Sequence, residues 1–326
     1  MKLGIIGAGS IIQDFLPRLM TMKELDIKTI QGTLRSKEKV EKLANDNNIE
    51  KVVFDFEDLI KCDIDTAYIA TPNASHYEYC KKALENGLNV VVEKPWVTNY
   101  NQALELKELA IKNHRYIFEA ISTVYLDSYE QIRNWINKIG DIKLVNMNYS
   151  QYSRRYDAFK KGEILPAFDP NQAGGALMDL NVYNISFVLG LFGEPVTYQY
   201  YANIEKGIDT SGELIMKYPT FIANCTAAKD CAGSFNFYIQ GDEGYISIKY
   251  PPNVIGEIKL HLNDNSEETV YEPMAMDRIK KEFEWFIKYI DEDDYDGFLK
   301  RLDASILVSK IMNESRKQVG IVFPQD

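Results

Sequence analysis

The sequence predicts an α/β fold in two parts: a doubly wound parallel sheet, then an α+β domain with a large open, mainly antiparallel sheet. Over residues 1–120, continuous apolar runs alternate with helical patterns, as in a parallel sheet covered by helices on both faces. Over residues 121–326, runs rich in Tyr, Thr, Ile and Phe follow one another with few helices between them, which is typical of antiparallel strands. We therefore expect two domains that meet near residue 120.

The first part contains six expected strands, each a short apolar run. They lie near residues 3–6, 27–34, 52–54, 66–70, 89–93 and 116–120. The helix after the first strand has one apolar stripe, formed by Ile12, Leu16 and Leu19. Polar side chains suited to cap the later helices are Ser36, Asn73 and either Thr98 or Asn99.

The second part begins with an expected helix over residues 126–139. A later segment, 176–192, is apolar nearly all round, which indicates a buried helix. Strands are expected over residues 198–204, 212–218, 222–229, 234–239, 244–249 and 258–262. Two helices, near residues 276–289 and 295–317, are expected to close the chain.

Composition argues against several classes of protein. The formal net charge is -11, so neither nucleic acid nor an anionic membrane is an expected partner. The 4 cysteines and 3 histidines lack the spacing of a zinc site, and we expect no metal; the run 291–294 is expected to be a solvated loop. No apolar stretch reaches the length of a membrane-spanning helix, and the N-terminus lacks the charged region and cleavage site of a signal peptide. We expect a cytoplasmic protein.

A glycine pair marks a nucleotide site. Gly7 and Gly9 follow the first strand and open the first helix, which is the context of the Rossmann dinucleotide fingerprint. The first glycine permits a tight turn, and the second lets the backbone approach a pyrophosphate. Ile12 replaces the third glycine, and a plain turn is the alternative interpretation. The residues expected to hold the pyrophosphate at the start of the helix are Ser10, Ile11 and Ile12.

The end of the second strand selects the nucleotide. NAD-binding proteins usually place an acidic residue there, but residues 32–36 contain none. Arg35 and Ser36 are instead suited to a 2′-phosphate, so we expect NADP in preference to NAD. The alternative is that Arg35 is a solvated loop residue.

Two further motifs carry candidate catalytic groups. Lys94 ends a parallel strand at its carboxyl edge, where open α/β sheets place their ligands, although a snorkelling surface lysine is the alternative. Asp179 and Tyr183 lie four residues apart on one face of the apolar helix. A buried carboxylate needs partners, so this face indicates a lined cavity or, alternatively, a local structural pair.

The motif Glu93-Lys94-Pro95, together with Gly-Gly-Ala-Leu-x-Asp-x-x-x-Tyr at residues 174–183, resembles the Gfo/Idh/MocA oxidoreductase family. Residues 71–73 with His76 resemble that family's cofactor loop. The last motif tyrosine, residues 118–120 and the tail 320–324 are similar to the dimeric dihydrodiol dehydrogenases and NADP-dependent D-xylose dehydrogenases. Asn181, where the family commonly has glycine, and residues 121–125 depart from the pattern, which leaves aldose specificity open.

The resemblance implies an NAD(P)-dependent dehydrogenase or reductase of a sugar, polyol or related hydroxy compound. Tyr183 would exchange a proton with the substrate hydroxyl, Lys94 would lower the pKa of that phenol, and Asp179 would hold the sugar or the lysine. The bond before Pro95 is a candidate for the cis form. The further residues that the resemblance assigns to cofactor binding are Thr71, Pro72, Asn73, His76 and Glu93.

The resemblance also implies a homodimer or homotetramer formed through the open face of the C-terminal sheet. Two other activities remain open: an NAD-dependent glycosidase of the same fold and a non-catalytic NAD(P)-sensing regulator. Residues 152–156 are aromatic and basic, and they indicate either a polyol-binding surface or a solvated loop.

Overall fold

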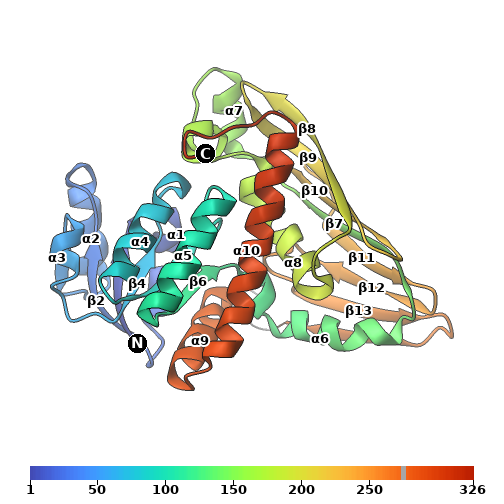
Figure 1. The fold of residues 1–326 in the computed structure, drawn as a ribbon, viewed down its shortest axis with the longest axis horizontal. Helices are drawn as coiled ribbons and strands as arrows, with labels where there is room; N and C mark the ends of the chain where they lie inside the picture. The colour runs from blue at the N-terminus through green and yellow to red at the C-terminus, as the bar shows by residue number, and fades with distance from the viewer. Residues whose placement is uncertain (273–276) are drawn as a thin grey trace. The chain divides into compact units, whose positions relative to one another are not determined.

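The computed structural model describes residues 1–272 and 277–326, which form two compact units (Figure 1). The first unit contains residues 1–120 and 279–303, and the second contains residues 121–278 and 304–326. The chain thus returns to the first unit near its C-terminal end, which the sequence pattern did not indicate. The expected helix start at Met276 lies outside the described residues.

The first unit is built on a six-stranded sheet in the order β3-β2-β1-β4-β5-β6, with every pair parallel. Its strands are β1 (Lys2–Ile6), β2 (Asp26–Gln31), β3 (Lys51–Val53), β4 (Thr66–Ile69), β5 (Asn89–Glu93) and β6 (Ile117–Ala120). Its helices are α1 (Ser10–Leu19), α2 (Lys37–Asp46), α3 (Phe56–Leu59), α4 (His76–Glu85), α5 (Tyr100–Asn113), α9 (Arg278–Asp291) and the start of α10 (Tyr295–Gln318). This confirms the doubly wound plan.

Apolar packing on the sheet of the first unit explains its strand pattern. Helix α4 packs on β4 and β5, and α2 packs on β2 and β3. The returning helix α9 packs through aromatic rings: Phe286 stacks on Phe118 with ring centroids 4.7 Å apart, and Phe283 meets Tyr68 at 5.3 Å. Strands buried in this way show unbroken apolar runs, which is what the sequence displays.

The second unit is built on an eight-stranded sheet in the order β14-β13-β12-β11-β7-β10-β9-β8. Only β10 and β7 are parallel neighbours; the other pairs are antiparallel. Its strands are β7 (Ile142–Ser150), β8 (Thr197–Glu205), β9 (Ile208–Lys217), β10 (Ile222–Ala228), β11 (Asn236–Gly241), β12 (Gly244–Lys249), β13 (Glu257–Leu262) and β14 (Glu267–Tyr271). Its helices are α6 (Asp127–Trp135), α7 (Arg154–Lys160), α8 (Val182–Phe192) and the end of α10. The mainly antiparallel sheet is confirmed, whereas β7, β14 and α7 were not expected.

The apolar helix of the second unit is not regular throughout. Residues Leu177–Asn181 form a π-helical turn that leads into α8. Buried Asn181, at the position where the family commonly has glycine, donates to the carbonyl oxygen of Cys225 at 2.9 Å, and Asn184 donates to that of Thr226 at 2.9 Å. These two amides tie the helix to β10.

The expectation that no apolar stretch reaches membrane-spanning length is wrong. Among the described residues, the segment Pro170–Phe192 is long and apolar enough to cross a membrane, judged by length and composition alone. However, 67% of its most apolar stretch is buried inside the fold. A core helix that packs against a sheet is apolar on most sides and passes the same test.

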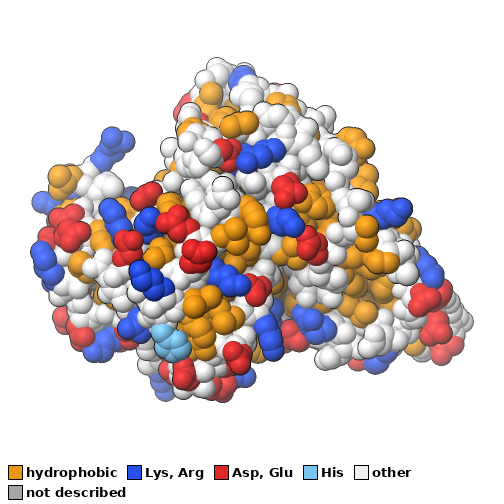
Figure 2. Space-filling model, viewed as in Figure 1, with side chains coloured by type: hydrophobic (Ala, Val, Ile, Leu, Met, Phe, Trp, Pro, Cys, Tyr) orange, Lys and Arg blue, Asp and Glu red, His pale blue; other side chains and the backbone are white. Residues whose placement is uncertain are grey.

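On the face shown in Figure 2, Lys and Arg side chains are interspersed with Asp and Glu.

Helix caps differ in part from those expected. Asn99 caps α5 by accepting from the backbone N–H of Gln102 at 3.0 Å. The hydroxyl of Ser36 bonds back to Thr33 instead of capping α2, because the two close a capping box around a short 3₁₀ turn. Asn73 lies inside a 3₁₀ turn before α4.

Candidate active site

The glycine turn after β1 has the geometry of a nucleotide cradle. Gly7 has φ +115°, and a Cβ there would lie 2.4 Å from the carbonyl oxygen of Ala70, so only glycine fits. Gly9 is different, because a Cβ there would meet nothing nearer than that same oxygen, at 3.9 Å. The fold therefore does not require glycine at position 9. The open space above Gly9 suits the close approach of a pyrophosphate.

The N-terminus of α1 supplies donors beside this turn. The helix has no side-chain cap and no acidic residue in its first turn, so its first backbone N–H groups are available to an anion. The Ile12 side chain is fully buried, so this residue offers a ligand only its backbone. Gln13 steadies the turn by donating to the carbonyl oxygens of Ala8 and Gly9 at 3.2 and 3.1 Å. Strand order reverses between β1 and β4, where doubly wound sheets bind their ligands.

Arg35 lies in the 3₁₀ turn Leu34–Ser36 directly after β2, and its side chain is exposed. The turn is held by mutual hydrogen bonds between Thr33 and Ser36. The Ser36 hydroxyl is therefore part of the turn, and the guanidinium of Arg35 is the cationic group there. These residues fit the 2′-phosphate of NADP.

The loop after β4 is held by His76, whose ring is fully buried. Its Nε2 lies 2.8 Å from the carbonyl oxygen of Thr71, and its Nδ1 lies 2.9 Å from that of Pro95. Burial lowers the pKa of His76. Because both ring nitrogens face backbone carbonyls, His76 acts on a cofactor only by tying the Thr71 loop to the segment after β5.

Lys94 follows the carboxyl end of β5 and is half-buried. The Lys94–Pro95 peptide bond is cis, as expected. The neighbouring Glu93 carboxylate accepts a hydrogen bond from the Tyr68 hydroxyl at 2.6 Å, which fixes the end of the strand. The ammonium is close enough to His76 to lower the pKa of that ring.

In the second unit, Asp209 holds the start of the helical segment that follows Gly174 and Gly175. Its Oδ2 accepts from the backbone N–H of Leu177 at 2.6 Å and from the Tyr200 hydroxyl at 2.8 Å. Gly175 has φ +104°, and a Cβ there would lie 2.1 Å from Asp209 Oδ1, so the motif needs glycine at this point. Burial raises the pKa of Asp209 to about 6.

Asp179 is paired with a lysine that the sequence analysis did not single out. Lys229 donates to Asp179 Oδ2 at 2.8 Å and to the carbonyl oxygen of Ala167 at 2.6 Å, and its ammonium lies 4.6 Å from the Phe168 ring centre. The Lys229 side chain is 2% exposed. The expectation that Asp179 is buried is wrong, because its side chain is 33% exposed where it lines an open cavity.

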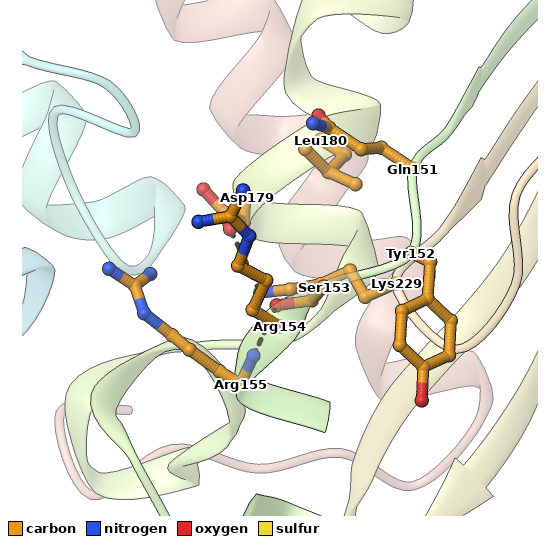
Figure 3. Close-up of a pocket in the computed structure, with 8 residues that line it drawn as sticks. All are labelled: Gln151, Tyr152, Ser153, Arg154, Arg155, Asp179, Leu180 and Lys229. Atoms are coloured by element: carbon orange, nitrogen blue, oxygen red, sulfur yellow. Dashed lines mark hydrogen bonds and ion pairs between the residues drawn. The ribbon is translucent and has the colours of Figure 1, made fainter. Parts of the chain in front are cut away.

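That cavity has a volume of about 390 Å³ and lies entirely within the second unit (Figure 3). The side chains that line it are Gln151, Tyr152, Ser153, Arg154, Arg155, Asp179, Leu180 and Lys229. Its volume is within the range of small-molecule sites, and its lining is mainly polar. Residues 152–156, for which a solvated loop was the alternative, include the start of helix α7.

Tyr183 lies on the first turn of α8, four residues after Asp179, and is half-buried. Its ring is tilted against that of Tyr149, with centroids 5.8 Å apart. By contrast, the hydroxyls of Ser122 and Thr123 donate to the carbonyl oxygens of Asn253 and Pro252, at 3.0 and 2.9 Å. Two of the residues that depart from the aldose pattern are therefore engaged by the backbone.

Lys229 and Asp209 are the residues that the sequence analysis missed. Lys229 directly follows β10, as Lys94 directly follows β5, but β10 contains Asn224 and Thr226 and shows no continuous apolar run that would have marked the lysine. Asp209 gives no such signal, because only the fold brings β9 to the helix start. Among the described residues, no group of three His, Cys, Asp or Glu side chains is placed to hold a metal ion.

Comparison with known proteins identifies the chain. Residues 1–120 match the model of the oxidoreductase family with an NAD-binding Rossmann fold, and residues 129–247 match the GFO/IDH/MocA C-terminal domain. A scyllo-inositol 2-dehydrogenase (NADP(+)) of Bacillus subtilis is 31% identical over 100% of this chain and 99% of its own length. A trans-1,2-dihydrobenzene-1,2-diol dehydrogenase of Xenopus tropicalis is 28% identical over 99% of both chains.

Among solved structures, the 3-ketoreductase KijD10 from Actinomadura kijaniata, in complex with NADP and TDP-benzene, superposes with a TM-score of 0.85. It is 19% identical, and the match covers 98% of this chain and 97% of that one, which shows a shared fold. The chain belongs to the Gfo/Idh/MocA family. It is an NAD(P)-dependent oxidoreductase of CH–OH groups, the class of chemistry that the dehydrogenase and ketoreductase names describe.

Proposed function

We propose that the protein uses NADP in preference to NAD to oxidise or reduce a CH–OH carbon of a sugar, polyol or related hydroxy compound. The observation that carries the proposal is that one chain holds both a nucleotide cradle, open above Gly9, and a polar cavity lined by Asp179 and Lys229. The relatives named as inositol and dihydrodiol dehydrogenases act on compounds with neighbouring hydroxyls, which supports this substrate class.

The preference for NADP rests on the turn after β2. Arg35 is exposed there and no acidic residue lies in residues 32–36, so a ribose 2′-hydroxyl would lack its usual acceptor. A guanidinium binds a phosphate through paired hydrogen bonds. The relative from Bacillus subtilis is named as NADP(+)-dependent, which agrees with this assignment.

For catalysis, we propose that Tyr183 exchanges a proton with the substrate hydroxyl and that Lys94 assists it. The nicotinamide, when bound, supplies the hydride chemistry. A lysine ammonium near a phenol stabilises the phenolate and lowers its pKa, which suits proton transfer near neutral pH. Asp179 is fixed by Lys229 and so offers an oriented acceptor for a second substrate hydroxyl.

The test compares Lys94→Ala and Tyr183→Phe with the wild-type protein. Both variants should lose at least about a hundredfold in kcat, given the usual contribution of general acid–base catalysis, while the Kd for NADPH changes less than about threefold. Screening polyols and sugars with NADP and following absorbance at the nicotinamide band measures kcat. Full turnover in either variant would remove that residue from the mechanism. Release of a leaving group without net oxidation would favour a glycosidase.

We also propose that the protein is a homodimer or homotetramer formed through the open face of the eight-stranded sheet. Ile222 and Leu144 are exposed neighbours in the register of β10 and β7, and Tyr238 and Tyr245 are exposed on β11 and β12. Exposed apolar side chains on a sheet face favour association. Light scattering of the wild-type protein and of Ile222→Glu tests this, because a charge on this face should yield monomers.

A further inference from the structure

The cavity of the second unit carries an excess of positive charge. Three cationic side chains and one carboxylate line it: Arg154, Arg155 and Lys229 against Asp179. The Asp179 carboxylate already faces the Lys229 ammonium at 2.8 Å, so this pair is compensated locally. The excess therefore resides on the two guanidiniums (Figure 3).

No acidic side chain nearby is paired with these arginines. Asp157, on the same helix, accepts from the Tyr152 hydroxyl at 2.7 Å and pairs with Lys160 at 3.0 Å. Within the described parts of the chain, residues 1–272 and 277–326, neither guanidinium makes a hydrogen bond or an ion pair. In a protein of net charge -11, two adjacent arginines without an acidic partner that line one cavity are suited to an anion.

The helix that carries the arginines is anchored to the rest of the unit. The Tyr156 hydroxyl donates to Glu205 at 2.6 Å, and the buried Phe159 stacks on Phe168 with ring centroids 4.8 Å apart. Phe168 in turn lies beneath the Lys229 ammonium. The backbone that carries the two arginines is therefore held by the same packing that places Lys229 in the cavity.

We propose that the substrate carries an anionic group, a carboxylate or a phosphate, that binds Arg154 and Arg155 while its hydroxyls meet Asp179 and Lys229. The inference rests on the proposed function and narrows it from neutral polyols to sugar acids or phosphorylated sugars. A cavity of about 390 Å³ accommodates a ligand of this size. A planar guanidinium recognises both carboxylate and phosphate oxygens.

The test measures binding rather than turnover. The protein saturated with NADP is titrated calorimetrically with D-glucose, D-glucuronate and D-glucose 6-phosphate, which share a ring and differ in one group. At least one anionic compound should bind at least about tenfold more tightly than glucose, the effect of one charge-assisted hydrogen bond. Arg154→Gln and Arg155→Gln should each remove most of this preference. The control Lys161→Gln, an exposed cation outside the cavity lining, should retain it.

Salt provides a check that needs no variant, because raising the ionic strength should weaken binding of the anion but not of glucose. Equal affinity for all three compounds, no anion binding, or equal losses in Lys161→Gln would overturn the inference. The phosphates of the nucleotide are another source of anions, so NADPH is titrated separately. A tenfold loss of NADPH affinity in the arginine variants, without an anion preference in the wild type, would also overturn it. These outcomes are independent of the proposed function, which fails only if no compound is oxidised or reduced.

Discussion

Replacing Asp209 with Asn should change how the stability of the protein depends on pH. Burial raises the pKa of Asp209 from 3.8 to about 6, although hydrogen bonds from the Leu177 N–H and the Tyr200 hydroxyl oppose the rise. The folded state therefore binds this proton more tightly than the unfolded chain does. The resulting stabilisation is fully present below about pH 4 and is lost as the pH rises through about 6.

The magnitude follows from the two pKa values. Their difference corresponds to about 3 kcal/mol, of which about 2 kcal/mol is lost between about pH 4.5 and about pH 7.5. The amide of Asp209→Asn does not titrate, so the variant lacks this loss. Its free energy of unfolding, minus that of the wild type, should rise by about 2 kcal/mol over the same interval. Because the comparison is between two pH values, any fixed cost of fitting the amide cancels.

Urea unfolding followed by circular dichroism at the two pH values measures this difference. Tyr200→Phe provides the complementary variant. Removing its hydroxyl takes away a hydrogen bond that lowers the pKa of Asp209. The free energy of unfolding of this variant should therefore fall more with rising pH than that of the wild type. If Asp209→Asn and the wild type showed the same dependence on pH, Asp209 would not be the buried titrating group described here.

Three further predictions test the nucleotide cradle and the C-terminal end of the chain. Gly9→Ala should leave the free energy of unfolding within about 1 kcal/mol of the wild type while weakening NADPH binding in a fluorescence titration, whereas Gly7→Ala should destabilise the protein measurably. Arg35→Ala should raise the Kd for NADPH roughly tenfold or more and leave the Kd for NADH nearly unchanged; an equal effect on both would reject the 2′-phosphate assignment. Asp326→Ala should lower the free energy of unfolding by about 3 kcal/mol, measured by thermal or urea unfolding, because it removes the carboxylate that pairs with the guanidinium of Arg316, which is 1% exposed. Arg316→Met should lower it by less, because it leaves no charge buried. Equal losses in the two variants would contradict this account.

Local chemistry allowed much of the first unit to be predicted. Strands buried on both faces must be apolar throughout, so β1, β4 and β5 stand out as unbroken runs. Gly7 is required by a positive φ and a close carbonyl oxygen, and such a turn after a strand is legible in sequence. The cis bond before Pro95 followed from a resemblance, since nothing local to the chain distinguishes it from a trans bond.

The second unit was predicted less completely. Strand β7 alternates buried and half-exposed residues only over 145–149, after two exposed residues, so this stretch lacked a clear apolar run. Helix α7 is only seven residues long and has one buried side chain, Phe159, too few for a periodic signal. The return of α9 to the first unit depends on aromatic contacts such as Phe118 with Phe286, which join positions far apart in the chain.

The sequence by itself determined the family, the two kinds of sheet and the candidate residues Lys94, Asp179 and Tyr183, because those features depend on short motifs and on periodicity. Tertiary structure decided the surroundings of these residues. Lys229 is separated from Asp179 by fifty positions, yet its ammonium lies 2.8 Å away because β10 and the π-helical turn pack together. The charge of the cavity, and with it the class of substrate we infer, arises from such long-range pairs. Among the described residues they compensate Asp179 and Lys229 and give the guanidiniums of Arg154 and Arg155 no partner.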